Sequence, residues 1–263
     1  MKNRTKLPNI YLAVIMIIMY LPLVFVVVFS FNESKLTAAW TGFSLKWYQT
    51  LWHNEGLREA LWNSIVLGIL NCGVSAVIGT IGAIGMARVN YKSKGIVEYI
   101  STLPIMIPEI ILGMVFLAFF SLLNLPFGMT TLVIAHTTFC IPYIFMMVKA
   151  RLVGIDKSIA EAARDLGATQ VRTFFDITLP LIMPAVMSGC LLAFAMSFDD
   201  VVISIFVNGP KLNTLPIKIY TQLKTGVTPE INALCTVILI TVIFILFITS
   251  ALGNRGRRTD KGN

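Results

Sequence analysis

Long runs of apolar residues alternate with short polar connections along almost the entire chain. A helix needs roughly 20 residues to cross a hydrocarbon layer about 30 Å thick, and six of these runs are long enough. Because few charges interrupt the runs, we predict six membrane-spanning helices joined by short connections. The predicted spans lie near residues 10–31, 61–86, 97–123, 129–149, 181–207 and 232–253.

The composition indicates an integral membrane protein. Of the 263 residues, 56% are hydrophobic and 13% are charged, and the mean hydropathy is +0.80. Soluble domains carry about 25% charged residues, so an ordinary soluble fold is excluded. The chain has no long linker and no internal repeat of about 20 to 50 residues, which favours a single all-α transmembrane domain over residues 1–263.

Positive charge is concentrated in alternate connections. Of the 21 Lys and Arg residues, 15 fall before the first predicted span, between spans two and three, between spans four and five, and after span six. Cytoplasmic connections carry the excess of Lys and Arg in membrane proteins. We therefore predict that both termini and the connection 150–180 are cytoplasmic, and that the net charge of +8 reflects orientation rather than a nucleic-acid partner.

The connection 150–180 reads as an amphipathic helix–turn–helix. Ser158 and Glu161 have the spacing of a capping box, in which both side chains satisfy free backbone N–H groups at a helix start. Gly167 can end this helix in the left-handed conformation, and Thr169 can cap a second helical turn. The apolar residues of the first helix form one stripe at helical spacing, Ile159, Ala162, Ala163 and Leu166. This stripe fits either a partner protein or packing of the loop on its own helix bundle.

Three carboxylates lie inside apolar runs. Glu109 follows Pro108 in the third predicted span, and Asp199 and Asp200 are adjacent in the fifth. A carboxylate in hydrocarbon costs about 2.5 to 3.5 kcal/mol, and apart from Lys149 at the very end of the fourth span no Lys or Arg lies in the spans to pair with these three. They are candidates for the path of a cationic cargo, with helix capping or bonding to a partner's hydroxyl groups as the other interpretation. Successive helical residues point about 100° apart, so at most one of the two aspartates faces a pore squarely.

The sequence offers no catalytic or metal-binding pattern. The four cysteines lie in apolar runs without metal-ligand spacing, and we interpret them as packing residues. His53 and His136 are isolated along the sequence, which gives no support for a metal site or a general base. No Gly-x4-Gly-Lys-Ser/Thr phosphate loop is present, so the chain cannot hydrolyse ATP itself. We expect a transport subunit with no cofactor and no metal.

The connection 150–180 also carries a motif that resembles a known family. It reads Glu-Ala-Ala, then Gly, then Ile-x-Leu-Pro, which is similar to the EAA loop of bacterial ABC-importer permeases. The matching residues are Glu161, Ala162, Ala163, Gly167, Ile177, Leu179 and Pro180. The six-span layout, the outer segment Trp-Thr-Gly-Phe at 40–43 with Trp-Tyr at 47–48, Pro-Glu at 108–109 and Ser-Phe-Asp-Asp-Val-Val at 197–202 resemble the permeases of spermidine/putrescine importers.

This resemblance implies a MetI-like permease fold with a cytoplasmic coupling helix, in the inner membrane of a bacterium. It implies that residues 161–180 couple the permease to a cytoplasmic ATPase, present in two copies. A second homologous permease subunit and an extracytoplasmic binding protein would complete the importer. Asp199, Asp200 and Glu109 would line the path of a polyamine, spermidine or putrescine.

Two other functions stay open from the sequence. The first is an ABC permease for another small solute, such as a phosphonate, thiamine or iron, although an anionic cargo fits the acidic residues poorly. The second is a secondary cation transporter that uses the intramembrane acids. Such carriers show inverted internal repeats, and we find none in this sequence.

Overall fold

The structure is a computed structural model that describes residues 6–35, 39–88, 92–210, 212–226 and 228–259. The described residues form helices and loops, and their only β-type pairing is one isolated bridge between Asn32 and Phe43. The elements are α1 (Lys6–Phe29), α2 (Lys46–His53), α3 (Glu55–Arg88), α4 (Lys94–Met106), α5 (Glu109–Leu122), α6 (Met129–Val153), α7 (Lys157–Asp165), α8 (Gln170–Thr173), the π-helix η1 (Phe174–Thr178), α9 (Leu179–Asp199), α10 (Val202–Val207), α11 (Leu215–Thr225) and α12 (Pro229–Thr259).

The chain divides into two compact units, which we describe separately. The first comprises residues 1–58 and 221–263, and the second comprises residues 59–220. In the first unit, α12 packs against both α1 and α2. The Asn54 side chain donates a 2.7 Å hydrogen bond to the Glu230 carboxylate, which ties the start of α12 to the end of α2.

The segment between α1 and α2 is held by hydrogen bonds of one buried asparagine, Asn32. The Asn32 side chain donates to the carbonyl of Ala39 and accepts from the backbone N–H of Thr41, each at 2.9 Å. The indole N–H of Trp47 donates to the backbone carbonyl of Asn32 at 2.7 Å. These bonds tie Asn32 to residues 39–41 and to Trp47, and the side chain of Phe43 is largely exposed.

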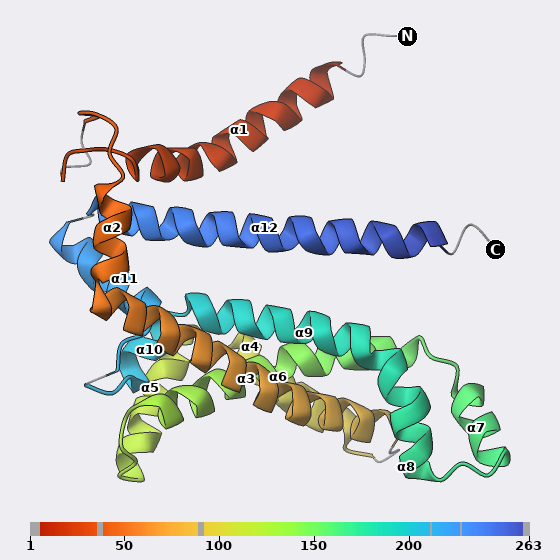
Figure 1. Cartoon of the computed structure of the whole chain (residues 1–263). Coiled ribbons are helices and arrows are strands. Elements are labelled where there is room, and N and C mark those ends of the chain that lie inside the picture. The colour runs from red at the N-terminus through yellow and green to blue at the C-terminus, as the bar shows by residue number, and fades with distance from the viewer. Residues whose placement is uncertain (1–5, 36–38, 89–91, 211, 227, 260–263) are drawn as a thin grey trace. The chain divides into compact units, whose positions relative to one another are not determined.

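In the second unit, α6 and α9 lie side by side and form the centre of the core (Figure 1). Close approach of α3 is permitted by glycines: a side chain at Gly79 would meet the backbone carbonyl of Ile141 and the side chain of Ile144 at 3.1 Å. The buried Asn71 side chain of α3 donates to the carbonyl of Ala193 in α9 at 3.2 Å. Small residues and buried amides of this kind hold membrane helices together where water provides no driving force.

The third predicted span is broken where the sequence places prolines. Helices α4 and α5 meet at an angle of 102° across Ile107 and Pro108. Pro108 has no backbone N–H and interrupts the helical hydrogen-bond ladder, which accounts for the break in this span. Glu98 on α4 forms an ion pair with Lys149 on α6.

The count of six spans is not reproduced in full. Four helices within the described residues are long and apolar enough to cross a membrane, and the bent pair α4 and α5 makes a fifth if it counts as one span. In α12 the shorter apolar stretch runs over Pro229–Ile245. Several side chains in the remainder of the sixth predicted span, near 232–253, lie outside the described set. The fifth predicted span, 181–207, is two helices, because the chain leaves α9 at Asp200 before α10 begins.

Candidate functional site

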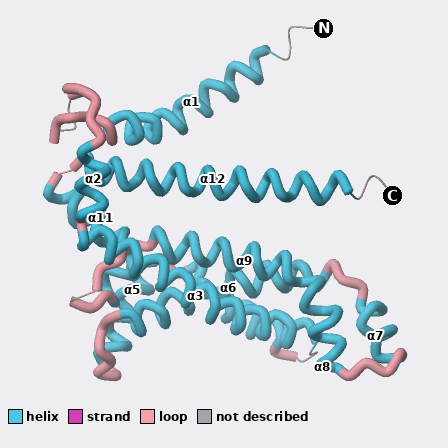
Figure 2. The backbone as a smooth tube through the Cα atoms, in the orientation of Figure 1, coloured by secondary structure: helices cyan, strands magenta, loops and turns pink. Residues whose placement is uncertain are grey.

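The helix–turn–helix expected in residues 150–180 is present at one end of the second unit. Figure 1 shows α7 beyond the ends of α6 and α9, at the opposite end of this unit from α10. Loops on both sides of α7, drawn in pink in Figure 2, join it to α6 and α8. The segment therefore presents a short helix away from the packed core of its unit.

The start of α7 differs from the sequence prediction. Asp156, not Ser158, is the N-cap, and its carboxylate accepts a 2.9 Å hydrogen bond from the backbone N–H of Ser158. This bond is the main reason why the pKa of the Asp156 carboxyl lies below its usual value. The capping box of Ser158 and Glu161 was the wrong interpretation, because an aspartate two residues earlier is an equally strong cap and starts the helix at Lys157.

The end of α7 agrees with the sequence prediction. Gly167 has a φ of +89°, in the left-handed region that favours glycine. The backbone N–H of Gly167 donates to the carbonyl of Arg164, and that of Ala168 donates to the carbonyl of Ala163. These two bonds are a Schellman motif, which satisfies the last carbonyls of the helix. Thr169 then caps α8 through a bond from the N–H of Arg172, as expected.

The apolar residues of this segment do not pack on the helix bundle of their own unit. The side chain of Leu166 is 89% exposed, that of Ile159 45% and that of Val171 67%. Of the remaining motif residues, Glu161 and Ala162 are exposed, Ala163 is half-buried, and Ile177, Leu179 and Pro180 lead into α9. An apolar surface on a short helix outside the core is typical of a site that binds another protein.

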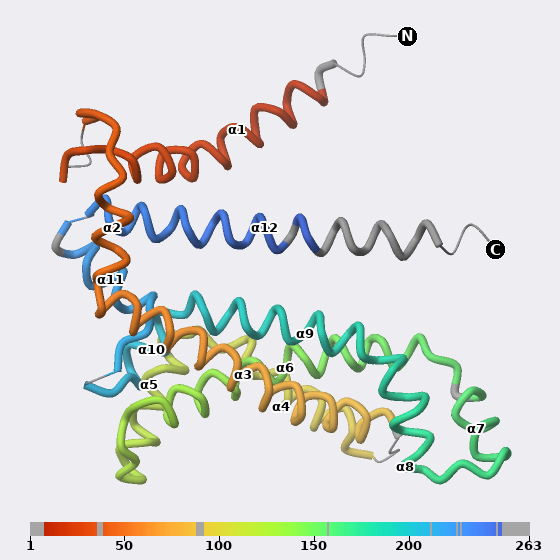
Figure 3. Tube along the Cα trace, in the orientation of Figure 1, coloured from red at the N-terminus to blue at the C-terminus, as the bar shows by residue number. Residues whose placement is uncertain are grey.

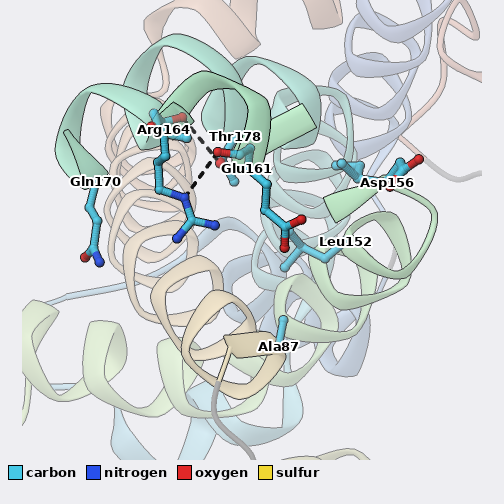
Figure 4. Close-up of a pocket in the computed structure, with 10 residues that line it drawn as sticks. Ala87, Leu152, Asp156, Glu161, Arg164, Gln170 and Thr178 are labelled. Atoms are coloured by element: carbon cyan, nitrogen blue, oxygen red, sulfur yellow. Dashed lines mark hydrogen bonds between the residues drawn. The ribbon is translucent and has the colours of Figure 1, made fainter. Parts of the chain in front are cut away.

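A pocket of about 430 Å³ lies beside α7, and residues of α7, α3 and α6 line it. Figure 4 shows Glu161 and Arg164 projecting from α7 into this space, with Leu152 and Thr178 on its walls. The guanidinium Nε of Arg164 donates to the carbonyl of Ala160 at 3.2 Å, which directs the side chain back along the helix. The pocket is lined by residues of this helix–turn–helix together with Ala87 of α3 and Leu152 of α6.

The second group of candidate residues comprises Glu109 at the start of α5 and the two aspartates at the end of α9 farther from α7. Figure 3 shows the chain running from α8 along α9 to α10. Glu109 is exposed in the first turn of α5, and Asp199 is exposed as the last residue of α9. Neither carboxylate forms an ion pair with any residue that the structure describes. Asp200, directly after Asp199, is only 8% exposed.

The buried Asp200 carboxylate caps α10. Its two oxygens accept hydrogen bonds from the backbone N–H groups of Ile203 and Ser204 at 3.2 and 2.8 Å, and the Ser204 hydroxyl donates to it at 2.7 Å. The imidazole Nε2 of His136 on α6 lies 3.4 Å from the same carboxylate. Among the described residues, Asp200 thus has hydrogen-bond partners that Asp199 and Glu109 lack.

His136 is the functional candidate that the sequence did not indicate. Its ring is fully buried, with Nδ1 2.8 Å from the Ser197 hydroxyl and Nε2 3.1 Å from that of Ser204. The sequence shows no neighbouring partner for His136, because its partners lie 61 to 68 residues further along the chain, on α9 and α10. Ser, His and Asp meet here, but Ser197, His136 and Asp200 are all buried. A hydrolase needs its nucleophile open to the substrate, so this cluster is not a hydrolytic site.

Comparison with known proteins agrees with a transport permease. Over residues 75–258 the chain matches the family described as binding-protein-dependent transport system inner membrane component. The chain belongs to this family. It is therefore a multi-pass inner-membrane transport subunit rather than an enzyme, of a class that works with a binding protein and an ATPase.

The similar proteins include polyamine permeases. The spermidine/putrescine transport system permease protein PotC of Escherichia coli K12 is 38% identical over 245 residues, covering 93% of this chain and 92% of that protein. The putrescine transport system permease protein PotI of the same organism is 39% identical over 247 residues, covering 91% and 88%. PotC of Haemophilus influenzae is 36% identical over 250 residues, covering 95% and 97%.

Solved structures share the fold at low sequence identity. A chain of a bacterial ABC transporter involved in alginate import superimposes with a TM-score of 0.72 at 14% identity, covering 94% of each chain. A chain of the MetNI methionine ABC transporter in an inward-facing conformation gives a TM-score of 0.60 at 18% identity, covering 76% of this chain and 95% of that one. The expected MetI-like permease fold is thus confirmed.

Proposed function

We propose that this chain forms part of the translocation path for polyamines, spermidine or putrescine, in an ATP-driven importer. The observation that carries the proposal is the pair of exposed carboxylates, Asp199 and Glu109, which form no ion pair with the described part of the chain. A carboxylate within an apolar span is costly unless a cation or water reaches it. Relatives named as polyamine permeases match the chain at 36–39% identity.

Carboxylates on separate helices suit a cargo that carries several separated positive charges. Polyamines are extended chains with two or three ammonium groups, so each ammonium can meet a separate carboxylate in turn. Asp199 and Glu109 lie on different helices, α9 and α5, and so supply two such positions. In this proposal Asp200 contributes indirectly, because its carboxylate is turned toward His136 and the backbone of α10.

Uptake of radiolabelled spermidine and putrescine, measured in parallel in cells, tests the cargo proposal. Asp199→Asn and Glu109→Gln keep the size and hydrogen bonding of each side chain and remove its charge. We expect uptake to fall on the order of tenfold, as for a lost hydrogen bond to a charged group, and spermidine to lose more than putrescine. Wild-type uptake of both amines in both variants, at normal membrane levels, would exclude these acids from the path.

We further propose that both termini and residues 150–180 face the cytoplasm, and that the exposed face of α7 and α8 binds the ATPase. Two ATPase copies, a second permease subunit and an extracytoplasmic binding protein would complete the importer. Support comes from the 15 to 6 division of Lys and Arg and from the exposure of Ile159, Leu166 and Val171.

Leu166→Ser tests the docking face. Because the side chain is 89% exposed, we expect the stability of the permease to change by no more than about 0.5 kcal/mol. Co-purification of the ATPase should nevertheless fall. Leu122→Ser is the matched control, because Leu122 is 79% exposed at the end of α5 and lies outside the proposed interface. If both variants retained the ATPase equally, the docking assignment would be wrong.

A further inference from the structure

The buried cluster around His136 has a defined pattern of proton donors. The Ser204 hydroxyl has one proton, which it donates to the Asp200 carboxylate at 2.7 Å. Its oxygen can therefore only accept a hydrogen bond from His136 Nε2, 3.1 Å away. Nε2 must carry a proton, and this N–H is also the group that faces Asp200 at 3.4 Å. The imidazole thus supplies positive potential to a buried carboxylate whose other hydrogen-bond donors, the N–H groups of Ile203 and Ser204 and the Ser204 hydroxyl, are neutral.

Asp200 sets the end of α9. Its backbone is extended, with φ −65° and ψ 125°, and its carboxylate caps the first turn of α10. A buried carboxylate that loses a charged or proton-donating partner becomes costly to keep in place. Without the N–H of His136, the Asp200 carboxylate would have a lower free energy when turned toward water. The position of the break between α9 and α10 would then shift, because this carboxylate caps α10.

The break also decides where Asp199 points. Adjacent helical residues project about 100° apart, so fixing Asp200 toward α6 leaves Asp199 on another side of α9, where it is exposed. A second contact supports the same arrangement: the Thr131 hydroxyl at the start of α6 lies 3.0 Å from the carbonyl of Val207 at the end of α10, and its one proton is shared between this carbonyl and that of Gly128. Helix α6 therefore holds α10 at both of its ends.

We propose that His136 is a positioning residue for cargo recognition: through Asp200 and Ser204 it fixes the break between α9 and α10 that presents the Asp199 carboxylate to the cargo. This inference rests on the proposed function, because it assigns His136 a role in the recognition of the cationic cargo. His136 does not touch the cargo, since its ring is fully buried.

The test compares two substitutions in the assembled transporter. His136→Gln keeps an N–H donor that can reach Ser204 and Asp200, whereas His136→Phe keeps a ring of similar size and has no donor. We expect His136→Phe to lower spermidine uptake on the order of tenfold, and to lower the ratio of spermidine to putrescine uptake. Spermidine uptake by His136→Gln should remain within about twofold of the wild-type rate. Such a change is smaller than the effect of losing one hydrogen bond to a charged group. If His136→Phe retained more transport than His136→Gln, the role of His136 would be core packing and the inference would be wrong.

A double variant tests whether the effect passes through Asp199. If His136 acts by placing that carboxylate, His136→Phe should add little in a protein that already carries Asp199→Asn. If the fold-reduction of uptake in the double variant equalled the product of the two single-variant reductions, the proposal would be contradicted. Cys140→Ala is the matched control: Cys140 is also fully buried on α6, one turn from His136, and its substitution should leave the spermidine to putrescine ratio unchanged.

The outcomes separate this inference from the proposed function. Normal uptake by both Asp199→Asn and Glu109→Gln would exclude these acids from the path, whatever His136 does, and normal uptake by Asp199→Asn alone would remove the carboxylate through which His136 is proposed to act. Impaired uptake by Asp199→Asn with a normal ratio in His136→Phe would overturn only the positioning role. If His136→Phe fails to reach the membrane, Ser204→Ala takes its place, because it removes the hydroxyl that links Nε2 to the carboxylate. A wild-type ratio in Ser204→Ala would then contradict the inference.

Discussion

Asp199 and Asp200 are neighbours in sequence, yet one carboxylate is exposed and the other is capped and buried against His136. Helical geometry predicts from the sequence that the two residues point in different directions. Which of them turns inward depends on His136, whose contacts to α9 and α10 span 61 to 68 residues. The candidate acids could therefore be predicted from the sequence, because charges are rare in apolar runs. His136, the partner that distinguishes the two aspartates, could not be predicted.

Asp156 provides a prediction at the same scale. Asp156→Ala should increase hydrogen exchange of the amides at the start of α7, because it leaves the N–H of Ser158 without an acceptor. Asp156→Asn is the control and should retain protection, since asparagine caps equally well. Hydrogen–deuterium exchange with mass spectrometry distinguishes the two. Equal exchange in both variants would contradict the capping role.

The pH dependence of this cap follows from the lowered pKa of Asp156. A carboxyl whose pKa is lower in the folded state stabilises that state above its unfolded pKa of about 3.9, and loses this contribution as the pH falls through the folded value. Protection of α7 in the wild type, corrected for intrinsic exchange rates, should therefore be constant between about pH 5 and 8. A loss within this range would show that another group titrates.

At the scale of elements, the sequence was most informative where local chemistry dominates. The left-handed helix end at Gly167 and the cap at Thr169 were both predicted, because each depends on a few adjacent residues. The start of α7 was placed two residues late, since Asp156 and Ser158 are both good caps and the sequence does not show which carboxylate or hydroxyl meets a free N–H. The division of the fifth span into α9 and α10 was not in the predicted span 181–207, although helix capping was one interpretation of the acids, and the structure shows Asp200 capping α10.

Two glycines of α3 provide a matched test of helix packing. A Cβ at Gly79 would lie 3.1 Å from the carbonyl of Ile141, whereas nothing in this chain lies within 4 Å of a Cβ at Gly73. We expect Gly79→Val to destabilise the permease by about 1 to 3 kcal/mol through overpacking against backbone. Gly73→Val should have a much smaller effect on the isolated chain. Thermal unfolding of the two purified variants in detergent is the measurement, and equal midpoints would mean that α3 and α6 are not in close contact.

At the scale of the whole molecule, the orientation in the membrane is the prediction that the sequence supports through charge alone. Single cysteines introduced at positions 165 and 46 in a cysteine-free background should behave differently in intact cells. An impermeant thiol reagent should modify the cysteine at 46, in the outer segment, and leave the cysteine at 165, in α7, unmodified. Modification of position 165 from outside would reverse the assigned topology and remove the ATPase as a partner of α7.

The source of energy is the central claim, and purified complex in proteoliposomes tests it most directly. The complex of this permease with its ATPase, second permease and loaded binding protein is supplied with ATP on the ATPase side, and accumulation of radiolabelled spermidine is followed. We predict accumulation against the gradient that requires ATP and the binding protein and persists when a protonophore collapses the proton gradient. Accumulation that a proton or sodium gradient drives without ATP would contradict the account and indicate a secondary cation transporter.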